Sequence, residues 1–113
     1  MATIIQMAKS VQGDSDTEVQ MLKDALDAYE TAHPGAKAAL YRQNNASIRL
    51  RVIDQRFAPM NKSRRHGEVW DFLSHQLPED VLANISLLLT VTPSELNDSF
   101  VNFEFERPTP SQL

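Results

Sequence analysis

The chain has 113 residues, of which 42% are hydrophobic, so it is long enough for one domain with a modest core and too short for two. It contains no cysteine, which excludes disulfides, thiolate nucleophiles and cysteine-ligated zinc or iron-sulfur centres within the chain. The formal net charge of −4 is the sum of a basic region and an acidic remainder. Eight of the eleven Lys and Arg residues, and only one acidic residue, lie between Lys37 and Arg65.

A first helix is predicted after the Gly13–Asp16 turn. Ser15 and Glu18 have the spacing of a capping box, and apolar residues then recur at helical intervals. These apolar residues are Val19, Leu22, Leu26 and Tyr29. The helix should end at His33–Gly35, because Pro34 disfavours helical geometry in the residue before it and the glycine supplies the turn.

Two strands should follow, over Lys37–Tyr41 and Ser47–Ile53, joined by a turn over Arg42–Ala46. The turn contains two asparagines, which tolerate left-handed backbone angles. In the second strand Arg49 and Arg51 alternate with apolar residues, so the two arginines should emerge on the face opposite to the core. The apolar residues that should pack inward are Ile48, Leu50 and Val52.

A longer helix is predicted after the loop Phe57–Lys62, with Asn61 or Ser63 as its N-cap. Its apolar stripe, which we expect in the core, consists of Val69, Trp70, Leu73 and Leu77. Pro78 interrupts this helix and suits the first position of a short helix over Glu79–Ile85.

The last third of the chain predicts a strand and a short helix. Leu87–Val91 is a dense apolar run that is too short for most helices, which indicates a central strand. Thr92–Glu95 has capping-box spacing and predicts a short helix over Ser94–Ser99. Apolar and polar residues then alternate over residues 100–106, which form either an edge strand or an aromatic, acidic tail.

The predicted fold class is α+β: a small three-stranded mixed sheet with helices packed on one face, in the order α-β-β-α-α-β-α, plus a C-terminal extension. We expect residues 1–14 to be a flexible segment, residues 15–106 to form the single domain, and residues 107–113 to be disordered. Residues 1–12 lack the basic start of a secretion signal, and no uncharged stretch reaches the about 18 residues of a membrane span. We therefore expect a soluble cytoplasmic protein.

The order of elements and three local motifs resemble the BolA family. The motifs are Asp-x-Arg-Phe at the end of the second strand (Asp54–Phe57), the pair Arg65-His66 at the start of the longer helix, and a leucine-rich strand that leads into a Thr-capped helix (Leu87–Glu95). The resemblance covers roughly residues 18–99.

This resemblance implies a class II KH-like fold and a regulator of transcription or stress responses that binds a monothiol glutaredoxin, sometimes sharing a [2Fe-2S] cluster with it. It places His66 at the family's cluster-linked histidine, and Arg65 with the loop Phe57–Lys62 in its partner- and nucleic-acid-facing region. Three features depart from the family: Arg42–Ala46 contains no second His or Cys ligand, the chain lacks the Gly-x-x-Gly loop of KH domains, and its aromatic C-terminal extension is not typical of the family. The isolated chain should therefore hold no cofactor, and any cluster would be shared with the glutaredoxin.

A basic surface is the main candidate site, because the loop after the second strand should bring the longer helix back towards the strand end. The candidate partner-binding residues are Arg49, Arg51, Arg56, Phe57, Lys62, Arg64, Arg65 and His66. This surface is either solvated and paired in part with acidic residues of the first helix (Asp24, Asp27 and Glu30), or it binds nucleic acid or an acidic protein surface. Only Phe57 and Tyr41 are available there for base stacking, so sequence-specific RNA recognition is not expected.

His66 is either a metal ligand or partner contact, or a partly buried histidine that packs on the apolar stripe of its helix. His75 follows nine residues later on the opposite helix face, so the two histidines cannot share one metal ion. His33 should be a surface turn residue.

No catalytic motif occurs in the sequence, and Asp71 with His75 at helical i, i+4 spacing is expected to be a solvated pair. A small hydrolase that used His66 or His75 would need further catalytic residues beside the histidine, and the sequence offers no such set. We therefore expect a non-enzymatic, BolA-like regulatory module that binds a partner protein or nucleic acid. The alternative is a structural or assembly protein that forms a homodimer through its aromatic C-terminal segment.

Overall fold

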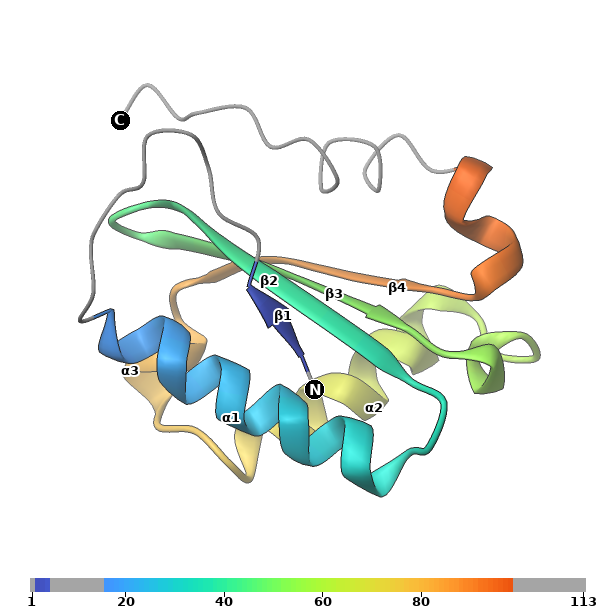
Figure 1. Ribbon diagram of the computed structural model, residues 1–113, viewed down its shortest axis with the longest axis horizontal. Helices are drawn as coiled ribbons and strands as arrows, with labels where there is room; N and C mark the ends of the chain where they lie inside the picture. Colours follow the sequence, from blue (N-terminus) through green and yellow to red (C-terminus); the bar gives the residue numbers. More distant parts are fainter. Residues whose placement is uncertain (1, 5–15, 99–113) are drawn as a thin grey trace.

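The computed structural model describes residues 2–4 and 16–98, which form an α+β fold (Figure 1). The strands are β1 (Thr3–Ile4), β2 (Lys37–Asn44), β3 (Ser47–Ile53) and β4 (Ile85–Val91). The helices are α1 (Thr17–Ala32), α2 (Lys62–Ser74) and α3 (Glu79–Leu82), with the 3₁₀ helices η1 (Gln55–Phe57) and η2 (Pro93–Asp98). None of the helices in the described ranges is long and apolar enough to cross a membrane.

The strands form one mixed sheet in the order β1-β2-β3-β4. β2 and β3 form an antiparallel hairpin, whereas β1 is parallel to β2 and β4 is parallel to β3. The register places Leu50 of β3 between Leu40 of β2 and Leu88 of β4. The connection from β3 to β4 passes through α2 and α3, since two parallel strands need a crossover.

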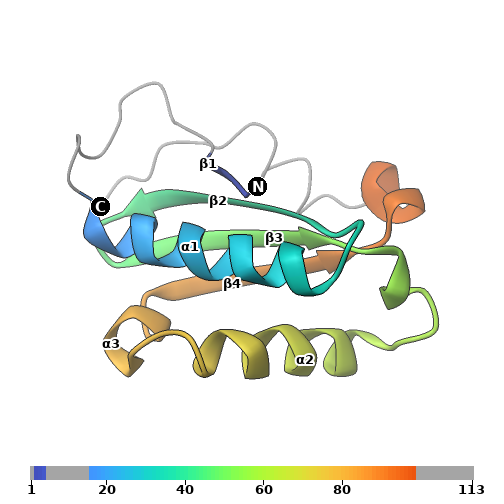
Figure 2. The same cartoon turned by 60° about the horizontal axis from the view of Figure 1, so that its bottom comes forward.

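One hydrophobic core lies between the sheet and the helices α1 and α2, which run along the same sheet face (Figure 2). Aliphatic side chains with no exposed surface come from α1, β2, β3 and α2, and they are Leu22, Leu26, Leu40, Ile48, Leu50, Val52, Val69 and Leu73. Burial of such a side chain contributes about 1.5–3 kcal/mol. The predicted inward face of the second strand is therefore confirmed, while Trp70 is only partly buried against this core.

α1 ends where its sequence predicts. The N–H of His33 donates to the carbonyl oxygen of Tyr29 (2.9 Å), and Gly35 then takes a φ of 96°, an angle that other residues rarely adopt. At the other end, the Asp16 carboxylate accepts a hydrogen bond from the N–H of Val19 (3.2 Å) and caps the helix. The predicted cap, Ser15, lies outside the described residues.

The predicted hairpin is confirmed, but its turn is shorter than the sequence indicates. β2 extends to Asn44, which leaves only Asn45 and Ala46 in the turn. The register of the strand pair shifts between Arg42 and Asn44, at a bulge. The Asn44 side chain accepts a hydrogen bond from the N–H of Ala46 (2.8 Å). Since no non-glycine residue in the described ranges has a positive φ, asparagine acts here through its side chain and not through left-handed geometry.

The rest of the sheet differs from the prediction in three ways. It has a fourth strand, because Thr3–Ile4, in the segment expected to be flexible, pairs with β2. α3 is a single turn that ends at Leu82, so the following strand begins already at Ile85. In the part of the chain that the structure describes, β4 is the last strand of the sheet and not a central one.

The final predicted helix is the 3₁₀ helix η2. The Glu95 carboxylate accepts a hydrogen bond from the N–H of Thr92 (2.9 Å), which confirms the capping-box contact. The N–H of Glu95 donates to the carbonyl oxygen of Thr92 (3.0 Å), three residues earlier, which is the 3₁₀ pattern of short helices. The alternating segment over residues 100–106 lies outside the described residues.

Candidate partner-binding site

The structure distributes the predicted site residues over three environments. Those buried inside the domain are Phe57 and Arg65. Those on the sheet face opposite to the helices are Arg49 and Arg51. The exposed remainder lies in η1 and the first turns of α2, and consists of Arg56, Lys62, Arg64 and His66. The predicted single basic surface is therefore wrong in this form.

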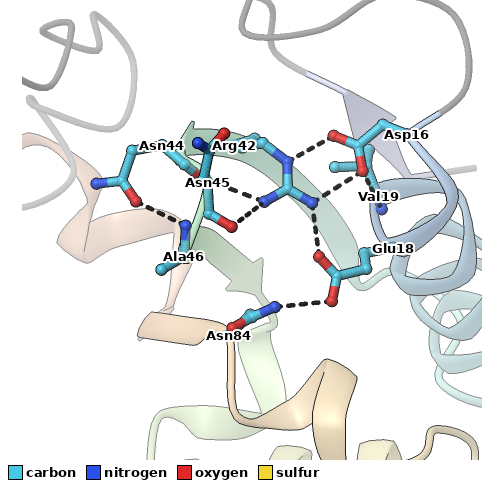
Figure 3. Close-up of polar contacts among 8 residues, drawn as sticks. All are labelled: Asp16, Glu18, Val19, Arg42, Asn44, Asn45, Ala46 and Asn84. Carbon is cyan, nitrogen blue, oxygen red and sulfur yellow. Dashed lines mark hydrogen bonds and ion pairs between the residues drawn. The ribbon is translucent and has the colours of Figure 1, made fainter. Parts of the chain in front are cut away.

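Arg42, another cation of the basic block, is held by internal contacts (Figure 3). Its Nε and Nη2 donate to the two carboxylate oxygens of Asp16 (2.6 and 2.8 Å), and Nη2 also donates to Glu18 (2.8 Å). Its Nη1 donates to the carbonyl oxygens of Asn44 and Asn45 (3.2 Å each). All the N–H groups of a guanidinium are thus used, and the start of α1 is joined to the β2–β3 hairpin.

Glu18 extends this network to the residue before β4, because its second carboxylate oxygen accepts a hydrogen bond from Asn84 Nδ2 (2.7 Å; Figure 3). The hydrogen bond from Arg42 lowers the pKa of Asp16 below its ordinary value, although partial burial acts in the opposite direction. The basic block does pair with the start of the first helix, through Asp16 and Glu18, which are other acidic residues than the three that the sequence suggested.

Arg65 is buried, with 5% of its surface exposed. Its Nε donates to the carbonyl oxygens of Phe57 and Met60 (3.0 Å each), and its Nη1 donates to that of Thr90 in β4 (3.3 Å). Nη1 and Nη2 also donate to the two carboxylate oxygens of Glu95 (2.7 and 3.1 Å). Arg65 therefore joins the loop before α2 to β4 and η2, which corrects its assignment to a partner-facing surface.

The Glu95 carboxylate is kept ionised by its donors. The hydrogen bond from Arg65 and a second one from the N–H of Thr92 lower the pKa of Glu95 to about 2. The same pairing raises the pKa of Arg65, so the ion pair persists across the neutral pH range.

Arg49 and Arg51 emerge opposite to the helices, as predicted, and both are half-buried. Arg49 Nη1 donates to the hydroxyl of its cross-strand neighbour Tyr41 (3.0 Å), and the guanidinium carbon lies 5.9 Å from the centre of the Tyr41 ring. Since α2 lies on the other sheet face, these two arginines do not share a surface with the cations of α2. Tyr41 and Phe57 retain 1% and 0% exposure, so neither ring is available for base stacking.

Arg56 is turned towards α1. Its Nη2 lies 3.4 Å from the hydroxyl of Tyr29, and its Nε lies 3.3 Å from a carboxylate oxygen of the buried Asp54. Asp54 also accepts a hydrogen bond from the N–H of Arg56 (3.0 Å) and caps η1. Arg56 lines a groove of about 330 Å³ whose walls come mainly from α1 and α2.

Lys62 and Arg64 are exposed in the first turn of α2. Asn61 caps this helix as predicted, since its side-chain oxygen accepts a hydrogen bond from the N–H of Arg64 (2.8 Å). The first turn contains no acidic residue, although the positive end of the helix dipole favours one there. The sequence thus concentrates positive charge where helix stability favours negative charge, and this arrangement favours binding of an anionic group.

His66 is exposed and stacks on Trp70, one turn further along α2. The two ring centroids are 5.9 Å apart and their planes are inclined by 14°. The expected partial burial of His66 is wrong, because the buried stripe of the helix runs through Arg65, Val69 and Leu73, and His66 lies beside it. Its expected packing on the apolar stripe is confirmed only at Trp70. The stack forms an aromatic surface next to the exposed cations.

The described residues contain no group of three or more His, Asp or Glu side chains that could hold a metal ion. His33 and His75 line the groove between α1 and α2 without forming such a group. His33 is half-buried against the Tyr29 ring, at a centroid distance of 4.2 Å, and is not the surface residue that was expected. His75 Nδ1 contacts the backbone carbonyl oxygen of Asp71 (2.7 Å) at an exposed position, so this contact does not involve the Asp71 carboxylate.

Comparisons with known proteins assign no family, because the chain matches no protein-family model and none of the curated proteins. The resemblance to the BolA family therefore stays a prediction.

Proposed function

We propose that this protein is a non-enzymatic interaction module that binds an acidic surface of a partner protein at the first turns of α2. The observation that carries this proposal is the stack of the exposed His66 on the partly buried Trp70, beside the exposed Lys62 and Arg64 at the positive end of the helix. Acidic side chains of a partner would pair with the two cations, and an apolar group would cover the rings. Aromatic and cationic side chains in this combination are typical of the residues that dominate binding energy at protein interfaces.

The scaffold beneath this surface supports a binding role, because it holds α2 in place before a partner arrives. Arg65 ties the helix start to β4 and η2, and Asn61 caps its first turn. A surface that is ordered in advance loses less conformational entropy on binding, so more of the contact energy contributes to affinity.

Nucleic acid is the weaker candidate. Binding to a phosphate backbone depends on many cations along one surface. Arg42 and Arg65 are engaged in internal ion pairs, and Arg49 and Arg51 lie on the other sheet face. The exposed cations near the start of α2 are few, which favours a compact acidic protein surface over an extended nucleic-acid chain.

The BolA resemblance supplies a specific candidate partner, a monothiol glutaredoxin. The exposed position of His66 supports this choice, because a histidine at the surface is accessible to a cluster that the partner carries. The alternative of self-association concerns residues 100–106, which lie outside the described ranges.

The test is a titration of the isotopically labelled full chain with a monothiol glutaredoxin and, separately, with an oligoglutamate peptide, followed by amide chemical shifts. Shifts should concentrate over residues 61–70, and the double substitution Lys62→Glu with Arg64→Glu should weaken binding at least about tenfold. Lys37→Glu is the matched control, since Lys37 is exposed but belongs to β2. Binding of neither probe, or equal effects of the double variant and the control, would contradict the proposal.

A further inference from the structure

The sheet face opposite to the helices is also apolar and buried. Ala39 and Tyr41 of β2 and Leu89 and Val91 of β4 retain 8% of their surface or less. None of these four residues belongs to the core cluster beneath α1 and α2. Burial of this kind requires a cover, and the helices α1 and α2 lie on the other face (Figure 2).

The face has a characteristic charge pattern as well. Its central row belongs to β3 and contains Arg49 and Arg51, which the register places between β2 and β4. Arg49 lies between Tyr41 and Leu87, and Arg51 lies between Ala39 and Leu89. A segment that fits this face must therefore supply apolar side chains for the flanks and negative charge for the centre.

We propose that residues 100–106 of the same chain dock on this face. Their sequence is Phe-Val-Asn-Phe-Glu-Phe-Glu, which offers three aromatic rings and two carboxylates. The complementarity is specific, since residues 5–15 offer no aromatic side chain and only one acidic residue, Asp14, balanced by Lys9.

The chain length allows this docking. The segment begins two residues after the end of η2 (Asp98), and η2 itself follows β4 closely in the chain. Seven extended residues span at most about 25 Å, whereas β4 and β2 are two strand spacings apart, about 10 Å. The segment is therefore long enough to cross from β4 to β2 in the same molecule.

Docking in the same chain gives the aromatic segment a role different from self-association. An exposed apolar sheet face would be a contact surface for a second copy. When residues 100–106 occupy it, this face is closed to other molecules, and the first turns of α2 remain the surface for a partner. The inference concerns a different surface from the proposed function and stands without it.

The test uses the absence of cysteine, which allows one nitroxide label to be attached at Asn102→Cys in the otherwise unchanged full chain. Docking predicts loss of the amide signals of Ala39 and Tyr41 in β2, and their return when the nitroxide is reduced. Loss confined to η2 and the end of β4 would overturn the proposal.

Two further measurements separate the remaining outcomes. The first measurement uses a mixture of two kinds of chain: one carries the nitroxide but no isotope, and the other is isotope-enriched but carries no nitroxide. Loss of the β2 signals in this mixture would show docking between two copies and overturn docking in the same chain. The added double substitution Phe103→Ser with Phe105→Ser should restore the β2 signals, while the amide of the buried Leu50 keeps its slow exchange as evidence of an intact fold. Unchanged β2 signal loss in this variant would also overturn the proposal.

Discussion

Arg65 and Glu95 join α2 to the segment after β4 through two hydrogen bonds of 2.7 and 3.1 Å. A bidentate pair of this kind is stronger and more specific in geometry than a single contact. Since Arg65 also donates to the carbonyl oxygen of Thr90 in β4, one side chain fixes the start of α2 relative to the sheet. The exposed cations Lys62 and Arg64 owe their position to this buried neighbour.

Replacement of Arg65 by methionine should lower the free energy of unfolding by about 3 kcal/mol, because it removes charge-assisted hydrogen bonds and leaves main-chain carbonyl groups without their donor. Urea denaturation measures this change. Arg64→Met is the matched control, since Arg64 is exposed on the same helix turn and its loss should cost less than about 0.5 kcal/mol. Equal costs for the two variants would show that the buried contacts of Arg65 do not stabilise the fold.

The depressed pKa of Glu95 predicts a loss of stability in acid. The folded-state pKa is about 2 against an ordinary value of 4.5, so the unfolded chain binds more protons between these values. The contribution of Glu95 is complete above about pH 4.5 and disappears as the pH falls towards 2. Glu95→Gln should therefore lower stability at pH 7 and bring the variant closer to the wild type near pH 2. Stability curves that stay parallel over this range would contradict the prediction.

Arg42→Lys should lower the free energy of unfolding by about 1–2 kcal/mol, because an ammonium group cannot reproduce the planar set of donors that reaches Asp16, Glu18 and the hairpin carbonyl groups. Amide exchange at Val19 should accelerate, since its N–H donates to Asp16. Arg64→Lys is the control, with no change expected at either readout. Equal exchange rates at Val19 in both variants would show that Arg42 does not stabilise the Asp16 cap of α1.

The alternation in β3 was the most reliable guide to the fold. Ile48, Leu50 and Val52 are buried as expected, because a period of two leaves only one register that hides them. The pairing of Thr3–Ile4 with β2 could not be predicted in the same way. A two-residue strand has no period of its own, and its position depends on the sheet it joins.

The basic surface was predicted less well because charge counts carry no information about partners. Arg42 and Arg65 find carboxylates that are 24 to 30 residues away in sequence. A usable signal was present for one of them: Arg65 precedes Val69 and Leu73 at intervals of four, which places it on the buried stripe of α2. The same spacing places His66 beside that stripe, where the structure finds it exposed.

The role of His66 can be separated from a general effect of histidine loss. Because the turn Arg42–Ala46 supplies no second His or Cys ligand beside His66, we expect the isolated protein to bind neither zinc nor an iron-sulfur cluster stoichiometrically. In the presence of a monothiol glutaredoxin that supplies cysteine and glutathione sulfur, His66→Ala should weaken a shared cluster complex more than His75→Ala.

His75 is a suitable control for this prediction, since it is also exposed but lies at the opposite end of α2, where its Nδ1 contacts the Asp71 carbonyl oxygen. The measurement is the cluster absorbance retained by each complex during dilution, read together with the elution volume of the complex. Equal and negligible effects of the two substitutions would exclude His66 as a cluster ligand. Its stack on Trp70 would then contribute to the interface only through the surface that the two rings present to the partner.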